Sequence, residues 1–262
     1  MARDRIGNVV RSLALIPPEQ DDRLMTVQKV VNGLNSAWGD EFQSDLSRFV
    51  LGWKPATNEI PAQARPVETV STVSDIERWE KNYQKLFPMA LVELSQVRIP
   101  EKPEGFGPMR LIVVAKELVE WTNGKPLEGT QEALKKHFRG WEYTDDLDVA
   151  IPTNDRDPRN GSYAVWVKDV QEADDENTHK SADDLKSEGH TGITLLERQL
   201  LEADYFLEKG EHLDIVNVTL CTGSRYRDGG VPRGYWDGGR FSVDWCSSAH
   251  RLGSLPSRRV WA

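Results

Sequence analysis

The sequence predicts an α+β fold in which an N-terminal helical segment precedes a C-terminal antiparallel-sheet domain with packed helices. Three observations predict it. Apolar residues recur at three- and four-residue spacing in 195–207, which is typical of a helix. Apolar and polar residues then alternate in 213–221 and 239–246, as in half-buried strands. Segments before residue 98 show helical spacing alone, interrupted by prolines.

The helix within 194–209 has clear start and stop signals. Thr194 is a good N-cap, and Glu197 three residues later completes a capping box. Gly210 follows Lys209 and is the usual end of a helix. Its apolar face is expected to pack on a sheet, and four charged residues are expected on the solvent face: Glu197, Arg198, Glu202 and Glu208.

A three-stranded antiparallel meander is predicted after this helix, with strands at 213–221, 233–236 and 239–246. The two turn signals are Asp228-Gly229-Gly230 and Asp237-Gly238-Gly239. In the last strand three alternating residues are expected to face the core: Phe241, Val243 and Trp245.

Earlier elements are expected as follows: helices at 22–38 and 40–51, an extended Pro-rich linker near 54–70, and a helix that begins with a capping box at Ser74 and Glu77. Pro88 is expected to kink or divide that helix, which then resumes over Met89–Val97. Because prolines and glycines gather in 98–108, we predict a boundary there. The resulting domains are a helical region, 1–98, and an α+β domain, 109–262.

Within 109–191, strands are predicted at 109–115 and 162–168. Thr130 is expected to cap a helix over 131–138, and a short helix is expected after Ser181. The stretch 141–148, aromatic and then acidic, is predicted to be irregular.

Several segments resemble a recurrent pattern in bacterial proteins catalogued without a function. They are GSYAVWVKD (161–169), EADDE (172–176), GITLLERQLLEADYF (192–206), TLCTGSRY (219–226) and WDGGRFSVDW (236–245). The resemblance covers roughly the last half of the chain. It implies a bacterial origin and a shared domain, and it carries over no catalytic or binding residue.

Charge is unevenly distributed along the 262 residues, whose net charge is −9. Residues 213–262 hold seven Arg, no Lys and four Asp, a net charge of +3, so the preceding residues carry −12. An acidic body argues against a protein that binds duplex nucleic acid over a basic surface. The start MARDRIGNVV shows no apolar signal region, and the longest purely apolar run is Leu111–Ala115, so we expect a cytoplasmic protein without a membrane partner.

No metal or other cofactor is expected. The segment Asp155–Gly161 resembles the start of a calcium loop, but its Asn and Gly come one residue late and Trp166 occupies the twelfth position. An Asx-rich turn is the favoured interpretation. The acidic and histidine residues of 174–184 are better interpreted as a solvated segment.

The two cysteines, Cys221 and Cys246, leave a thiol hydrolase open as one alternative. Cys246 lies four residues from His250 and Cys221 nine from His212, but no flanking protease signature or orienting third group is visible. In a meander with the middle strand between them the cysteines would lie about 9–10 Å apart, too far for a disulfide. If the third strand instead neighbours the first, that objection falls.

Guanidinium and aromatic groups interleave among glycines near the C-terminus. Such groups neutralise phosphates and stack on bases in single-strand binders. The candidate residues for nucleic-acid or anion binding are Arg225, Tyr226, Arg227, Arg233, Tyr235 and Arg240. The competing interpretation is structural, with each Arg paired to a nearby Asp.

No catalytic signature such as a Walker loop or a G-x-S-x-G elbow occurs. The sequence therefore favours a non-enzymatic protein-interaction or adaptor module of a bacterial cytosolic complex, with an unidentified protein partner. A binder of single-stranded nucleic acid or anions through the Arg-rich stretch is the alternative, and a Cys-dependent hydrolase is the second alternative.

Overall fold

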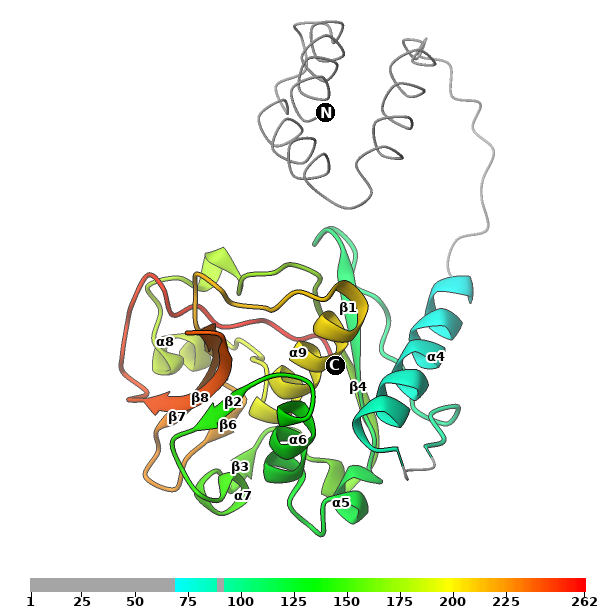
Figure 1. Cartoon of the computed structure of the whole chain (residues 1–262). Helices are drawn as coiled ribbons and strands as arrows, with labels where there is room; N and C mark the ends of the chain where they lie inside the picture. Colours follow the sequence, from blue (N-terminus) through cyan, green and yellow to red (C-terminus); the bar gives the residue numbers. More distant parts are fainter. Residues whose placement is uncertain (1–68, 89–91) are drawn as a thin grey trace, which may run out of the picture. The chain divides into compact units, whose positions relative to one another are not determined.

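Helix α9 lies between an antiparallel strand pair and a four-stranded sheet in the computed structural model of the chain, which describes residues 69–88 and 92–262 (Figure 1). The helices predicted at 22–38 and 40–51, and the linker 54–70 up to residue 68, lie outside the described residues. The described elements are, in chain order, α4 (Thr69–Leu86), β1 (Met109–Val114), α5 (Leu118–Trp121), α6 (Pro126–Lys135), β2 (Gly140–Glu142), α7 (Leu147–Ala150), β3 (Thr153–Asn154), η1 (Pro158–Asn160), β4 (Tyr163–Lys168), η2 (Asp175–Asn177), α8 (Ala182–Ser187), α9 (Leu195–Lys209), β5 (Thr219–Leu220), β6 (Ser224–Arg225), β7 (Val231–Asp237) and β8 (Arg240–Cys246).

The α+β class is confirmed. The larger sheet has the order β2-β8-β7-β5, and in it β5, β7 and β8 form the expected antiparallel meander. β2 pairs in parallel with the edge of β8 that lies away from β7, with Gly140 opposite Phe241. The other two sheets are the antiparallel pairs β1–β4 and β3–β6. No helix among the described residues is long and apolar enough to cross a membrane.

Helix α9 has the predicted caps. The hydroxyl of Thr194 accepts a hydrogen bond from the amide N–H of Glu197, whose carboxylate accepts one from the N–H of Thr194. Gly210 ends the helix at φ 67°, in the left-handed region that glycine tolerates.

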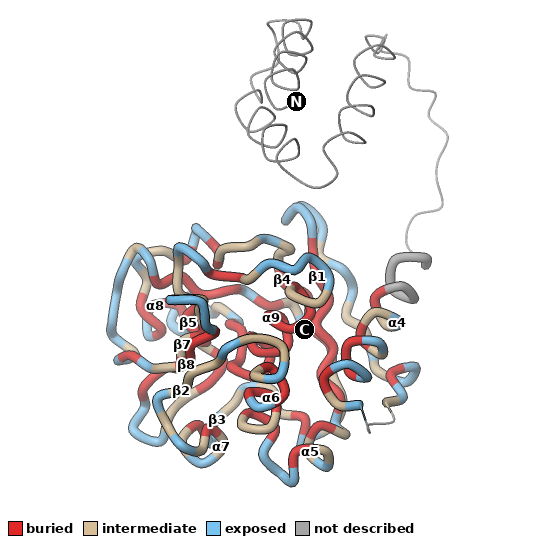
Figure 2. Tube along the Cα trace, viewed as in Figure 1, coloured by how far each residue is buried: buried red, intermediate tan, exposed pale blue. Residues whose placement is uncertain are grey.

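The solvent face predicted for α9 is correct for Glu208, which is exposed, but wrong for the other three residues, because Leu195–Tyr205 are all buried (Figure 2). The buried set includes Glu197, Arg198 and Glu202, each with no exposed surface. Charges can be buried when they are paired and hydrogen-bonded, and α9 meets its counter-charges on several sides. On one side Arg156 donates two hydrogen bonds to the carboxylate of Glu197, at 2.6 and 2.9 Å.

Helix α4 belongs to the same compact unit as the sheets, which runs from Pro66 to Ala262. Trp79 donates its indole N–H to the carbonyl of Leu111 at 2.7 Å, and Tyr83 donates its hydroxyl to the carbonyl of Val113 at 2.8 Å. Both rings are buried, and burial raises the pKa of Tyr83. The compact unit therefore extends on the N-terminal side of the boundary predicted at 98–108, because α4 supplies part of its core.

Four other local predictions need correction. α4 begins at Thr69, so Ser74 lies inside it, and it ends at Leu86, so the described residues 92–97 do not continue it as a helix. α6 begins with Pro126 as its first residue, where the fixed φ of proline suits a helix, and Thr130 lies inside it. The stretch 141–148 contains part of β2 and the start of α7. The expected strand 213–221 is reduced to Thr219–Leu220.

That last difference has a local cause. Asp214 adopts φ 53°, a conformation incompatible with an extended strand. The N–H groups of Ile215, Val216 and Asn217 then donate to the carboxylate of Glu172 instead of to a neighbouring strand. The apolar side chains of this loop, which were expected to alternate in a sheet, stay in solvent, with Val216 78% exposed.

We expect Trp79→Ala to lower the free energy of unfolding by about 3–5 kcal/mol, because the change leaves a large cavity and removes the indole hydrogen bond to the carbonyl of Leu111. Urea denaturation followed by circular dichroism would measure it. Gln84→Ala, on the exposed side of the same helix, should change little. Equal effects of the two substitutions would contradict the docking of α4 on β1.

Candidate functional site: an open face of the larger sheet

The two faces of the β2-β8-β7 sheet differ in what covers them. Phe241 and Trp236 face α9 and its flanking loop: Phe241 lies under the guanidinium of Arg198 at 5.1 Å, and Trp236 stacks on His212 with ring centroids 3.3 Å apart. Side chains alternate along a strand, and strand register fixes which residues share a face. The opposite side, here called the outer sheet face, carries Arg233, Tyr235, Arg240, Ser242 and Asp244, together with Trp141 of β2. Tyr143 follows directly after β2.

Only part of the outer sheet face is covered. At the end near Val231 and Cys246 it packs against Ala182 of α8 and Leu255. Toward the β7–β8 turn it is open: Arg240 is exposed and Tyr235 is half-buried. The open part is therefore a surface of rings and guanidinium groups on a rigid sheet.

Three of the six residues predicted to bind anions share this face. Arg233 forms a two-pronged ion pair with Asp244, with Nε–Oδ1 at 2.7 Å and Nη2–Oδ2 at 2.5 Å. The hydroxyl of Tyr235 donates to the same carboxylate at 3.2 Å, and burial together with that negative charge raises the pKa of the phenol. Arg240 instead lies over the ring of Trp141, with Cζ 5.1 Å from the ring centroid. The structural pairing expected for Arg therefore holds for Arg233 but not for Arg240.

The other three candidates lie outside this face, on β6 and the turn that follows it. Arg225 donates to the carbonyls of Thr222 and Ser224 at 2.6 and 2.8 Å, and Arg227 donates to the carbonyl of Val149 at 2.7 Å. The hydroxyl of Tyr226 is buried without a partner among the described residues, and burial raises its pKa. The six residues do not converge on one phosphate.

An aromatic patch lies around the C-terminal end of β2: Trp141, Tyr143 and Trp245. Tyr143 is 62% exposed and Trp245 39% exposed, and their rings make an edge contact at 6.4 Å. Trp245 was predicted to face the core with Phe241. Strand register does place it on the face of Phe241, but the expectation that it is covered there is wrong. Its position near the end of β8 leaves it uncovered, beside Gly230, which has no side chain to shield it.

A hollow of about 620 Å³ opens at the β7–β8 turn, and it is lined by Lys135, Arg139, Gly140, Asp237, Gly238 and Arg240. Lys135 is already paired, with Glu132 at 2.7 Å and with Glu142. Arg139 and Arg240 make no ion pair with any carboxylate in the described part of the chain. Three residues of this surface were not predicted from the sequence: Arg139, Trp141 and Tyr143. Aromatic rings at positions 141 and 143 are two residues apart, a spacing that indicates a strand with both rings on one face.

A group of carboxylates lies beside the hollow. Oxygens of Glu128, Glu132 and Glu142 lie within 4.8 Å of one another, a spacing that a cation could bridge. However, the ammonium group of Lys135 already contacts two of them, and Glu128 accepts a hydrogen bond from the N–H of Leu147 at 3.0 Å. A cation of the protein itself, the ammonium group of Lys135, thus already occupies the space between two of the three carboxylates.

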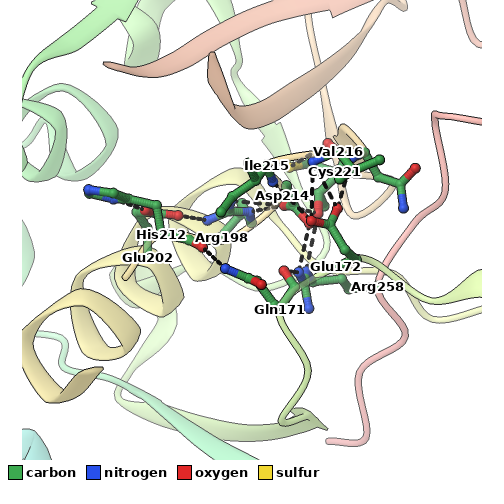
Figure 3. Close-up of polar contacts among 12 residues, drawn as sticks. Gln171, Glu172, Arg198, Glu202, His212, Asp214, Ile215, Val216, Cys221 and Arg258 are labelled. Carbon is green, nitrogen blue, oxygen red and sulfur yellow. Dashed lines mark hydrogen bonds and ion pairs between the residues drawn. The ribbon is translucent and has the colours of Figure 1, made fainter. Parts of the chain in front are cut away.

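A second polar cluster lies beneath the sheet (Figure 3), and four of its members are buried: Arg198, Glu202, Asp214 and Arg258. Asp214 accepts hydrogen bonds from Arg198 at 2.8 Å and from Arg258 at 2.7 Å. Arg198 also donates to Glu202 at 2.8 Å, and Glu202 in turn lies 2.8 Å from Nδ1 of His212. This cluster fills the space between α9, the sheet and the C-terminal segment. Asp214 is fully buried, so a substrate in solvent could not contact its carboxylate.

Cys221 lies beside this cluster, where a thiol hydrolase would need an activated nucleophile. It is fully buried, and burial raises the pKa of its thiol although Arg198 lies nearby. Cys246 is also buried, with its pKa raised for the same reason, and both cysteines are free. Thiolates are the reactive form, so neither environment activates the sulfur.

We expect Asp214→Ala to lower the free energy of unfolding by about 3–5 kcal/mol, because it leaves Arg198 and Arg258 buried without their shared counter-charge. Thermal and urea denaturation would measure the loss. Asp145→Ala removes an exposed carboxylate and should have little effect. If both substitutions were equally mild, the buried ion pairs would not hold the sheet to α9.

Both thiols should be almost unreactive toward a thiol reagent in the folded protein at neutral pH, because they are buried and their pKa values are raised. Denaturant should release both to rapid reaction. Fast modification of Cys221 in the native protein would restore the hydrolase alternative. A Cys246→Ser variant would assign the signal to one sulfur.

Comparison with known proteins returned nothing: no protein-family model, no curated protein sequence and no solved structure matched the chain.

Proposed function

We propose that the compact unit is a non-enzymatic protein-binding module, and that a protein partner docks on the aromatic patch and the open part of the outer sheet face. One observation carries the proposal: Tyr143 and Trp245 are exposed beside one another, next to an arginine stacked on Trp141. Trp, Tyr and Arg dominate the residues that contribute most to protein–protein affinity. We further propose that the partner belongs to a bacterial cytosolic complex.

Rigidity supports the proposal. The ring of Trp141 is carried by β2, which is paired with β8, and the N–H of Tyr143, the next residue after β2, donates to the carbonyl of Val243 at 2.9 Å. The backbone of both residues is therefore fixed before a partner arrives. Arg240 is held over Trp141 in the free protein, which reduces the entropy lost when it forms a contact. Aromatic side chains also lose little conformational entropy on binding, because they have only two rotatable bonds.

Nucleic acid is less favoured as the partner. The guanidinium groups of Arg225, Arg227 and Arg233 already donate to carbonyls or to Asp244, so few are left for phosphate. Asp244 and Asp237 add negative charge beside the same surface, and the whole chain carries −9. A polyanion would be repelled by these groups.

A site-specific cross-link in the host cell tests the proposal. A photo-reactive residue at position 143 should give one discrete protein adduct, whereas the same residue at Lys81, on the exposed side of α4, should not. The adduct identified by mass spectrometry is then purified and titrated with the protein. Tyr143→Ala/Trp245→Ala should weaken binding roughly tenfold or more, because aromatic contact residues each commonly contribute above 1 kcal/mol.

Equal adducts at both positions, or an affinity unchanged in the double variant, would remove the proposal. The nucleic-acid alternative has its own readout. A short single-stranded oligonucleotide that bound at low salt, and lost binding in Arg225→Ala/Arg227→Ala, would favour that alternative. Because Arg225 and Arg227 already donate hydrogen bonds to backbone carbonyls, we expect no oligonucleotide binding at low salt and no effect of this double substitution.

A further inference from the structure

The hollow at the β7–β8 turn contains two cations that the fold itself does not neutralise. Arg139 and Arg240 line it, and neither forms an ion pair with any carboxylate in residues 75–88 or 92–262. Arg225 and Arg227 also lack a carboxylate partner, but they donate to backbone carbonyls, whereas no side-chain hydrogen bond of Arg139 or Arg240 occurs among the described residues. The two free guanidinium groups are therefore available to an external anion.

The hollow is also organised before binding. Arg240 is held over Trp141, and the carbonyl of Arg139 accepts a hydrogen bond from the N–H of Phe241 at 2.9 Å, which ties its backbone to β8. The turn residue Gly238 has φ 58° and no side chain, so of the Asp237-Gly238-Gly239 turn only Asp237 places a side chain at the hollow. An incoming group thus meets two guanidinium groups attached to one rigid strand pair.

The charges around the hollow restrict what it can hold. Asp237 lines it, and the carboxylates of Glu132 and Glu142 lie next to it, on Lys135. A nucleic-acid backbone carries closely spaced charges, some of which would meet these carboxylates. A protein segment can instead place one or two carboxylates at the arginines and neutral groups elsewhere. The planar guanidinium also matches a carboxylate through two parallel hydrogen bonds.

We propose that the hollow binds an Asp or Glu side chain of an acidic segment in the partner, while an apolar side chain of that segment lies on the aromatic patch. The proposal rests on the proposed function, because it specifies the chemistry of the same docking surface. Carboxylates between Arg139 and Arg240 set the position of the segment along the sheet, and the rings of Tyr143 and Trp245 supply the apolar contact.

Binding of a fluorescently labelled peptide of alternating Glu and Leu to the full chain tests this inference by anisotropy at low and moderate salt. We expect the Glu peptide to bind and its Gln counterpart to bind roughly tenfold more weakly or not at all. Arg139→Ala/Arg240→Ala should abolish the preference for Glu. Lys136→Ala/Lys186→Ala removes the same charge from exposed positions outside the hollow and should leave the preference intact.

Reversing the charge of both arginines tests whether the alanine pair acts through lost charge or through a disturbed fold. Arg139→Glu/Arg240→Glu should reject the Glu peptide and bind a peptide of alternating Lys and Leu. The inference is overturned by equal binding of the Glu and Gln peptides, by equal loss in the two alanine pairs, or by a single-stranded oligonucleotide that binds the hollow more tightly than the Glu peptide.

Failure of this inference can be told apart from failure of the proposed function. If the protein cross-linked at position 143 binds Arg139→Ala/Arg240→Ala as tightly as the wild type, the docking surface stands and the carboxylate contact is wrong. If the Glu peptide binds through the two arginines but position 143 gives no discrete adduct in cells, the hollow is an anion site and the docking surface is wrong.

Discussion

The pairing of buried charges around α9 is the constraint on which the rest of this fold depends. On one side Asp204 accepts hydrogen bonds from Arg78, Asn82 and Arg110, which joins α9 to α4 and β1. On another side Arg198 donates a hydrogen bond to Asp214, which joins α9 to the loop that precedes β5 of the larger sheet. A charge left without its partner in such surroundings costs several kcal/mol, so every element around α9 must arrive in one position. Apolar contacts alone would permit more than one arrangement.

This arrangement separates the structural arginines from those that can act on another molecule. Arg110, Arg156, Arg198 and Arg258 are held by carboxylates of the protein, and they are buried or largely so. Arg139 and Arg240 lie at the far end of the sheet, beyond the reach of that network. The sheet thus carries a fixed, charge-balanced side toward α9 and, at the β7–β8 turn, two guanidinium groups that no carboxylate of the described residues balances.

The elements that the sequence predicted well are those whose signals are local. The caps at Thr194 and Gly210, the strand 109–114 and the Asp237-Gly238-Gly239 hairpin depend on neighbours a few residues away, and all are present. The errors have distant causes. The burial of Glu197 depends on Arg156, and β2 forms only because it meets β8, about a hundred residues later. Of the candidate site, Arg233, Tyr235 and Arg240 were found from residue type, whereas Arg139, Trp141 and Tyr143 required that long-range pairing.

The shortness of β2 has a consequence for how the protein behaves when it has no partner. A strand on the edge of a sheet presents unpaired backbone groups, and a long, flat, apolar edge is a template for open-ended association with other copies. β2 spans only Gly140–Glu142, and charged groups lie at its end: Arg139 precedes it, and Glu142 is paired with Lys135. The free edge of β2 presents too few unpaired backbone N–H and C=O groups for another chain to extend the sheet there. The protein can therefore expose the aromatic side chains of Tyr143 and Trp245 beside this edge without also offering a long strand edge on which other copies could assemble.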